Sequence, residues 1–439
     1  MSNWSTSKGR KITIGGSPAS DHPPPGAQEP QSVPAAGATA TPHQQASTRL
    51  AAIDQQLGAI PGNAVESLSR ARPPPSARAH AQRDWKHLPT FSQLPVMDGV
   101  PGCAWKLFGY EDQLGTVNLL TDGVVAQAAK EEIKSGTAIS LSWPLHLPIQ
   151  PFFHQPPLAH KVSASPSGAI DQITISSHSG SRWEGLRSVS LSKNRVYYQG
   201  VPAWELEAAF QQNPIRAHRP AGEAPGDIAN QLGIQHWARH GISGRGVLLD
   251  VWGYKLRNAA RKSRNLGGKA YDPMTTHAIT LQDLKETARA QGVKFRQGDI
   301  LLIRTGVTNS YYNSTPAQRE AWAARKPEEE AFAGVDQGTA VAAWFWDNHF
   351  AAAASDSPTF ESWPPRPSAN TGKDGRPRRP ASLRELLVPM MGMPVGMQWD
   401  LEALTRHCVR TRRWTFFMTS APNNVYGATA SPPNAFAFF

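Results

Sequence analysis

The stretch ISSHSGSRWEGLRS, residues 175–188, combines side chains that bind metal ions with side chains that repel them. His178 and Glu184 could each bind a metal ion or transfer a proton, whereas Arg182 lies between them and Arg187 follows shortly after. Zinc takes three or four nitrogen, oxygen or sulfur ligands, and harder divalent ions take more oxygens. One histidine and one glutamate beside an arginine therefore indicate a metal site only weakly, and metal-free acid–base chemistry stays open.

Other side chains that could do chemistry follow later in the chain: His236, His240, Asp250, Tyr254, Asp356 and Glu361. His236 and His240 are four residues apart, so they would share one face of a helix and could supply two ligands. Packed histidines with a structural role are the alternative, which we favour. We also favour structural roles for Asp250, near the end of a strand, and for Asp356, whose sequence SDSP fits a turn cap.

Strand and helix patterns alternate from about residue 120 to 420 without an internal repeat, which predicts one α/β domain with a central sheet flanked by helices. The apolar runs and end signals predict helices at 122–135, 202–212, 233–241, 280–292, 328–350, 382–392 and 400–412. Thr121, Thr280 and Asp400 are the expected helix caps. Strands are predicted at 137–145, 171–180, 245–254, 298–306, 351–357 and, as the closing strand, 413–422.

The composition divides the chain into two parts. Residues 1–84 are rich in Pro, Ala, Ser and Gln and cannot bury enough apolar surface to fold, which predicts a disordered tail. Residues 85–439 form the predicted folded domain. The Pro-, Gly- and Arg-rich residues 366–379 predict a surface loop that could cover the mouth of a pocket.

The net charge of +11 raises the possibility of a nucleic-acid partner. The basic residues are scattered, however, and no zinc-finger spacing, helix-turn-helix pattern or aromatic-and-basic RNA-binding motif accompanies them. We therefore expect no nucleic-acid partner. We also expect no membrane-spanning segment or membrane partner, because the sequence contains no run of about 18 apolar residues. Cys103 and Cys408 form no metal or disulfide pattern, and no signal pattern precedes the domain, so we expect a cytoplasmic protein.

From about residue 84 to its end the sequence resembles the cyclase superfamily, the kynurenine-formamidase-like metal hydrolases, in its fungal branch. The stretches that carry the resemblance are EDQLGTVNLLT, SGSRWEGLR, QHWARHGISGRGVLLD, GDILLIRTG, WDNHFAAAASDSPTFE, GMPVGMQWDLEAL and RWTFFMTSAPNNVYGATASPPNAFAFF. The resemblance implies a single cyclase-like domain of the swivelling β/α/β type. It also implies a dimer or tetramer, in which the apolar C-terminal residues could be buried.

The family signature, HxGTHxDxPxH, contains two histidines and an aspartate that bind zinc or manganese. His178 matches its first histidine, Gly180 its glycine and Ser181 its threonine. Arg182 replaces the second histidine, and Glu184 replaces the aspartate with a carboxylate that is one methylene longer.

The remaining family positions also differ in this chain. Ser188 stands where the resemblance places the catalytic histidine, Arg384 replaces a later histidine, and Met397 replaces a glutamate. Guanidinium groups cannot bind a metal ion and repel one. Hydrolysis by a metal-bound water is therefore not the expected mechanism.

We expect instead a metal-independent enzyme of fungal secondary metabolism that cyclises, isomerises or dehydrates a small carbonyl-bearing substrate. Arg182 and Arg384 would stabilise the developing oxyanion, and Glu184 or His178 would transfer the proton. No cofactor is expected. The residues predicted to line the substrate pocket are Ser181, Trp183, Arg187, Trp252, Tyr254, His240 and Met397.

Two alternatives stay open. One is an amide or lactone hydrolase with an atypical zinc or manganese site made of His178 and Glu184, joined by His240 or Asp356. The other is a binding or scaffold protein that keeps the fold without catalysis.

Overall fold

The computed structural model describes residues 85, 87–97, 99–192, 194–212, 230–262, 271–365 and 381–439. The predicted tail, residues 1–84, and the predicted loop, residues 366–379, lie outside the described residues.

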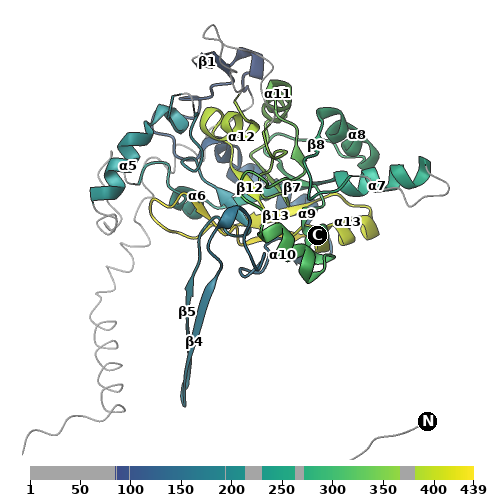
Figure 1. Ribbon diagram of the computed structural model, residues 1–439. Coiled ribbons are helices and arrows are strands. Elements are labelled where there is room, and N and C mark those ends of the chain that lie inside the picture. The colour runs from purple at the N-terminus through teal and green to yellow at the C-terminus, as the bar shows by residue number, and fades with distance from the viewer. Residues whose placement is uncertain are drawn as a thin grey trace, which may run out of the picture. The chain divides into compact units, whose positions relative to one another are not determined.

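The described chain contains both helices and strands (Figure 1). The α-helices are α4 (Asp122–Glu132), α5 (Ala203–Gln212), α6 (Gln235–His240), α7 (Val251–Lys262), α8 (Leu281–Gln291), α9 (Val307–Tyr312), α10 (Pro316–Ala323), α11 (Thr339–Asp347), α12 (Leu383–Glu385) and α13 (Glu402–Thr411). Short 3₁₀ turns are η1 (Phe91–Gln93), η2 (Gly115–Leu119), η3 (Phe152–His154) and η4 (Tyr198–Gly200), and η5 (Leu386–Met390) is a π-helix.

The strands are β1 (Val96–Met97), β2 (Val100–Pro101), β3 (Ala138–Ser140), β4 (Ala159–Ser165), β5 (Gly168–Thr174), β6 (Arg182–Glu184), β7 (Ile242–Asp250), β8 (Ala278–Ile279), β9 (Ile300–Arg304), β10 (Gly334–Val335), β11 (Ala352–Ser355), β12 (Val395–Met397), β13 (Thr415–Ser420), β14 (Ala430–Ser431) and β15 (Ala435–Phe438). None of the described helices is both long and apolar enough to cross a bilayer.

A nine-stranded sheet organises the described chain, in the order β14-β6-β12-β11-β9-β7-β13-β15-β3. The central strands β7, β9, β11 and β12 are parallel, and antiparallel strands extend the sheet on both sides. Strands β9 and β11 are buried along their whole length, as near-continuous apolar runs predict for a sheet covered on both faces. This arrangement confirms the predicted mixed α/β fold with a central sheet.

Several predicted elements are confirmed. Helix α4 begins after Thr121, whose side chain accepts a hydrogen bond from the Val124 amide. Helix α8 begins after Thr280 in the same way, and β9 lies within the predicted strand 298–306. The predicted cap of the last helix was wrong by one position: Leu401 is the cap residue of α13, and Asp400 before it accepts a hydrogen bond from the Glu402 amide.

Other predictions were wrong at their boundaries. Residues 251–254 begin helix α7 instead of continuing strand β7, because Asp250 accepts a hydrogen bond from the Gly253 amide and starts the helix within an unbroken apolar run. Residues 328–338 contain the short strand β10, and the helix begins only after Gly338. The strand predicted at 413–422 is not the last, since β14 and β15 come after it in the chain.

The predicted strand 171–180 belongs to a separate hairpin. Strands β4 and β5 pair only with each other in the described chain, every residue in them is exposed, and the hairpin projects from the body (Figure 1). The chain turns back into the central sheet after residue 180, so that His178 lies in the connecting turn and Arg182 begins β6.

A buried carboxylate, Asp112, ties the N-terminal part of the domain together. Its Oδ1 accepts hydrogen bonds from the Leu114 amide at 3.1 Å and from Asn118 Nδ2 at 2.7 Å. Its Oδ2 accepts from the Gly115 amide at 2.8 Å and from the Tyr198 hydroxyl at 2.9 Å. These contacts give the EDQLGTVNLLT stretch a structural role.

We predict that Asp112→Ala lowers the free energy of unfolding by about 3 kcal/mol, because it leaves several buried donors without an acceptor. Tyr198→Phe removes one hydrogen bond and should cost about 1 kcal/mol. Urea unfolding of both variants measures the difference. Equal losses in the two variants would contradict this account of Asp112.

Candidate functional site

Strand β6 places two charged side chains on one face of the sheet. Its three residues are buried, and side chains alternate along a strand, so Arg182 and Glu184 share a face while Trp183 faces the opposite side. Strand β12 pairs with β6 in antiparallel register, with Met397 opposite Arg182. The site therefore lies near one edge of the sheet, where β6 and β12 pair next to the edge strand β14.

The Arg182 guanidinium connects several groups in this buried space. Its Nη2 lies 3.2 Å from Glu184 Oε1, and its Nε donates to the same oxygen at 3.4 Å. Its Nη1 donates to Gln398 Oε1 at 2.7 Å, and its Nη2 also lies 3.1 Å from Met397 Sδ. Arg182 thus fills the position beside Glu184 that a bound cation would need.

A second guanidinium reaches Glu184 from helix α12. Arg384 Nη1 lies 3.5 Å from Glu184 Oε2, while Arg384 Nε donates to Glu361 Oε1 at 3.1 Å. The other oxygen of Glu361 accepts a hydrogen bond from the Leu383 amide at 2.7 Å. Glu361 therefore orients both the start of α12 and the side chain of Arg384, whose side chain is 21% exposed.

His178 lies beside this cluster, in the turn before β6. Its ring is partly buried, its Nδ1 lies 3.2 Å from Ser177 Oγ, and its carbonyl accepts a hydrogen bond from Arg182 Nη1. Burial lowers the pKa of His178, and the nearby charges of Arg182 and Arg384 lower it further against the opposing effect of Glu184. The imidazole is consequently neutral at pH 7.

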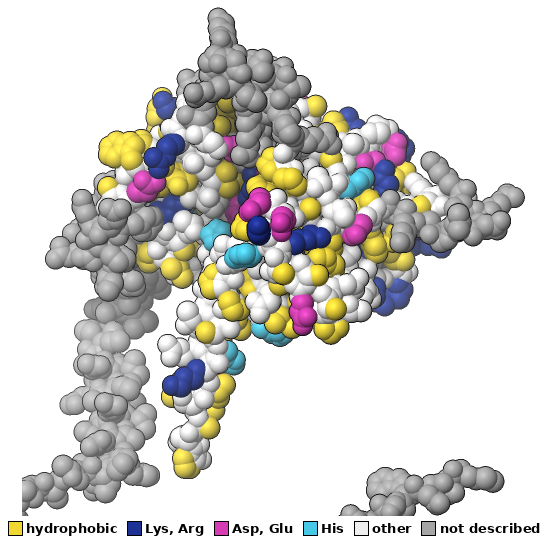
Figure 2. All heavy atoms as spheres, in the orientation of Figure 1, with side chains coloured by type: hydrophobic (Ala, Val, Ile, Leu, Met, Phe, Trp, Pro, Cys, Tyr) yellow, Lys and Arg dark blue, Asp and Glu magenta, His cyan; other side chains and the backbone are white. Residues whose placement is uncertain are grey.

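The pKa of Glu184 is also lowered. Burial alone would raise it, but the charges of Arg384 and Arg182 together outweigh burial. Glu184 is therefore ionised at neutral pH, which suits a counter-ion better than a general acid. Acidic, basic and histidine side chains gather near the centre of the face shown in Figure 2, close to the base of the β4–β5 hairpin.

The donor set does not fit a zinc or manganese ion. In the described part of the chain, no group of three or more His, Cys, Asp or Glu side chains could hold a metal ion. Glu184 Oε2 has no hydrogen-bond partner, yet it faces Arg384 Nη1, and Glu184 Oε1 faces Arg182. One guanidinium lies on each side of this carboxylate, and both repel a divalent cation.

The other residues predicted for the pocket fall into different places. The Ser181 hydroxyl donates to the Gln398 carbonyl and accepts from the Trp143 amide, which anchors β6. Trp183 is fully buried, packs edge-to-face on Trp399 and donates to Ser420 Oγ, so it belongs to the core on the far side of β6.

Four further predicted pocket residues contact other parts of the described structure and not the cluster around Glu184: Arg187, Trp252, Tyr254 and His240. Arg187 Nη1 donates to the Gln231 carbonyl, and burial lowers the pKa of Arg187 to about 10. Trp252 and Tyr254 lie on α7, where the Arg304 guanidinium covers the Trp252 ring. His240 is exposed at the end of α6, with its Nδ1 2.7 Å from the Gly241 carbonyl.

Asp250 and Asp356 have the structural roles that the sequence favours. Asp250 accepts from the Gly253 amide and pairs with Arg304 and Arg257. Asp356 accepts from the Thr305 amide and hydroxyl and from two further amides, although burial raises its pKa to about 6.

Two residues of the cluster were not assigned to this site from the sequence: Gln398, which was not singled out, and Glu361, which was noted only as a side chain that could do chemistry. Glu361 lies in the SDSPTFE stretch already noted for its carboxylates, and its burial next to an arginine could not be inferred from spacing. Gln398 directly follows Met397 and has a left-handed backbone, φ 56°, which is uncommon for a residue other than glycine. Its Nε2 is buried and hydrogen-bonds to no described residue.

Comparison with known proteins places these observations in a family. The Cyclase family model matches residues 139–362, just over half of the chain. Among solved structures, a novel cyclase aligns with a TM-score of 0.59 and 24% identity, covering 77% of this chain and 100% of that protein. This likeness shows a shared fold.

More distant similarities are also found. Isatin hydrolase A from Ralstonia solanacearum aligns with a TM-score of 0.40 and 11% identity over 69% of this chain and 91% of its own. A predicted metal-dependent hydrolase from Bacillus stearothermophilus aligns with a TM-score of 0.37 and 13% identity over 69% and 98%. No curated protein matches the sequence.

We predict that Arg182→Met lowers the free energy of unfolding by about 3–5 kcal/mol, because it removes one of the two charges that compensate the buried Glu184. The double variant Arg182→Met/Glu184→Leu should lose less than the sum of the two single variants. Urea unfolding of all four proteins in this cycle gives the coupling. Additive losses would contradict direct compensation between the two charges.

Proposed function

Because this chain belongs to the Cyclase family, we propose that it is an enzyme that acts on a small carbonyl-bearing substrate by metal-independent acid–base chemistry. The reaction is a cyclisation, an isomerisation or a dehydration. One observation carries the proposal: the guanidiniums of Arg182 and Arg384 flank the Glu184 carboxylate on both sides. Fixed positive charge thus stands where the family reaction would require a cation.

His178 is the proposed general base. A neutral imidazole can accept a proton at pH 7, and the lowered pKa of His178 keeps it neutral there. Its Nδ1 faces Ser177, while its Nε2 hydrogen-bonds to no residue in the described ranges. The residue is only partly buried, and the proposal places the substrate at Nε2.

Arg384 is the proposed electrophile. It is more exposed than Arg182, with 21% of its side chain accessible against 7%. When His178 removes a proton from the carbon next to a carbonyl, the C–H electron pair forms a C=C bond and the carbonyl oxygen becomes an enolate. The Arg384 guanidinium stabilises that oxygen, and the proton on His178 returns to another atom of the substrate.

Glu184 has a supporting role in this scheme, in contrast to the proton transfer that the sequence left open for it. It stays ionised, holds both arginines in place and favours the imidazolium that His178 becomes during the reaction. Arg182, which is nearly inaccessible, positions Glu184 and Gln398.

The biological setting is part of the same proposal. The resemblance to the fungal branch of the family supports a role in the secondary metabolism of a fungus, in the cytoplasm and as a homo-oligomer. The apolar C-terminal residues form β15 within the chain's own sheet, where Phe439 is buried and Phe436 is exposed, so only part of this segment is open to an oligomer contact.

We predict that the protein catalyses exchange of α-protons for deuterium in some members of a panel of small ketones, β-keto esters and lactones in D₂O. Proton NMR against an enzyme-free blank measures the rate. His178→Gln should slow exchange by about 10²- to 10⁴-fold, whereas His160→Gln, on the exposed hairpin, should not change it. The rate should rise with pH to a plateau, with an apparent pKa below 6.5, because the neutral form of His178 is the base. A rate that falls over this range would contradict the role of His178.

We also predict that the purified protein holds far less than one equivalent of zinc or manganese and that chelation leaves the exchange rate unchanged. Elemental analysis by mass spectrometry measures the content. Near-stoichiometric metal, together with chelator-sensitive hydrolysis of amides or lactones, would overturn the proposal in favour of a metal-dependent hydrolase. Absence of metal, exchange and hydrolysis together would indicate a non-catalytic protein.

A further inference from the structure

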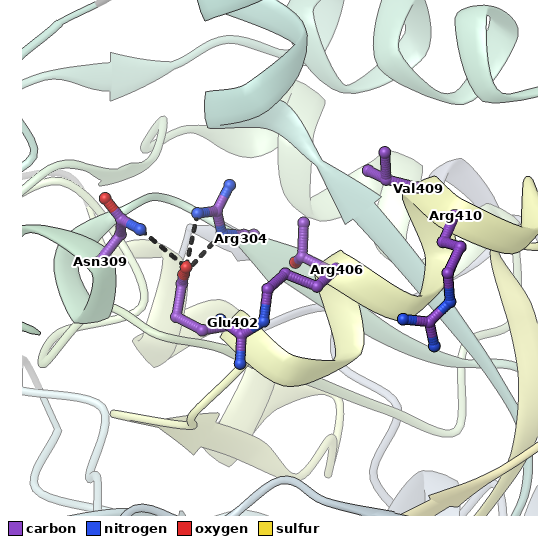
Figure 3. A pocket seen from close by; sticks show the side chains of 7 residues that line it. Arg304, Asn309, Glu402, Arg406, Val409 and Arg410 are labelled. Atoms are coloured by element: carbon purple, nitrogen blue, oxygen red, sulfur yellow. Dashed lines mark hydrogen bonds and ion pairs between the residues drawn. The ribbon is translucent and has the colours of Figure 1, made fainter. Parts of the chain in front are cut away.

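A cavity of about 390 Å³ lies between the end of β9 and helix α13 (Figure 3). It shares no lining residue with the cluster around Glu184. Its lining residues are Arg304, Asn309, Glu402, Thr405, Arg406, Val409 and Arg410. Three guanidiniums and a single carboxylate therefore border this cavity.

On the inner wall of the cavity, two carboxylates balance the positive charge of Arg304. Arg304 Nε and Nη2 donate to the two oxygens of Glu402 at 2.7 and 2.8 Å, and Arg304 Nη1 lies 2.9 Å from Asp250 Oδ1. Asn309 Nδ2 donates to Glu402 Oε2 at 2.8 Å, as the dashed lines of Figure 3 show. Glu402 binds Arg304 and Asn309, and no ion pair joins it to Arg406 in the described chain.

The outer wall carries positive charge without a counter-ion. Arg406 and Arg410 are exposed, and their spacing of four residues places them on one face of α13, where like charges destabilise a helix. Among the described residues, neither forms an ion pair with a carboxylate.

Arg410 has a neutral neighbour instead. Its Nη2 lies 3.1 Å from His407 Nδ1. Burial lowers the pKa of His407, and the charges of Arg410 and Arg413 lower it further, so the ring accepts the hydrogen bond as neutral imidazole. The charge of Arg410 thus stays available to a ligand.

A buried hydroxyl in the same cavity gives an independent indication of a ligand. Thr405 is 6% exposed, and its Oγ1 has no hydrogen-bond partner in the described chain. Buried polar atoms are almost always satisfied, so an unsatisfied hydroxyl that lines a cavity indicates a missing partner. This hydroxyl lies one residue before Arg406 and belongs to the same lining.

We propose that this cavity binds a small molecule through a doubly charged oxyanion group, either a phosphate or a dicarboxylate. Arginine forks match the oxygens of both groups, and the Thr405 hydroxyl supplies a further donor. The cavity volume lies within the range of small-ligand sites. The positive outer wall excludes a cation as the ligand.

Isothermal titration calorimetry of the full chain with inorganic phosphate and with succinate tests the proposal and distinguishes the two oxyanions. Arg406→Ala/Arg410→Ala should weaken binding of the preferred anion by about tenfold or more, because two charged donors are lost. Thr405→Val should weaken it by about threefold, because one neutral donor is lost. Arg406→Lys/Arg410→Lys should give an intermediate affinity.

Arg289→Ala is the matched control, since Arg289 is an exposed arginine near the end of another helix, α8. It should leave the affinity unchanged, and thermal unfolding should show that every variant folds. Failure of both anions to bind the wild-type chain at about 10 mM would overturn the proposal. An equal loss in Arg289→Ala and in the double variant would also overturn it. The outcome is independent of the exchange chemistry at His178.

Discussion

The charge balance around Glu184 is the constraint on which the site depends. A lone ionised carboxylate in the interior is unfavourable by several kcal/mol, and removal of one partner from a buried pair is strongly destabilising. Glu184 is ionised because Arg182 and Arg384 approach it from two elements, β6 and α12. Arg384 is in turn held by Glu361, which follows β11. The order β6-β12-β11 in the sheet is therefore required to bring these charges together.

Much of the fold could be predicted because its elements carry local signals. Strand β9 is a short apolar run between Gly298 and Gly306, and α8 begins with the capping residue Thr280. Local signals failed where one mainly apolar run includes both the end of a strand and the start of the next helix. The sequence VLLDVWGY reads as a single strand, yet Asp250 ends β7 and starts α7 through one side-chain hydrogen bond. That bond depends on backbone geometry, which hydrophobic periodicity does not encode.

The site was predictable only where it followed the family motif. That resemblance placed His178, Arg182, Glu184 and Arg384 in one site, and the structure brings them together, although their roles stay predictions. The partners of these residues were not predictable, because Arg182 and Gln398 are 216 residues apart. Adjacent side chains of a strand face opposite sides of the sheet. The sequence could therefore have predicted that Trp183 faces away from the pocket that Arg182 and Glu184 share.

Two of the buried arginine clusters in the described chain, one around Arg304 and one around Glu184, differ in how completely their hydrogen bonds are satisfied. Arg304 has all its described contacts satisfied by Asp250 and Glu402, so its network is complete without a ligand. Around Glu184, an acceptor of Glu184 and a donor of Gln398 remain without hydrogen bonds. A partly satisfied buried network is less stable than a complete one. The open groups of Glu184 and Gln398 beside the partly exposed Arg384 support the proposal that a bound substrate completes this network.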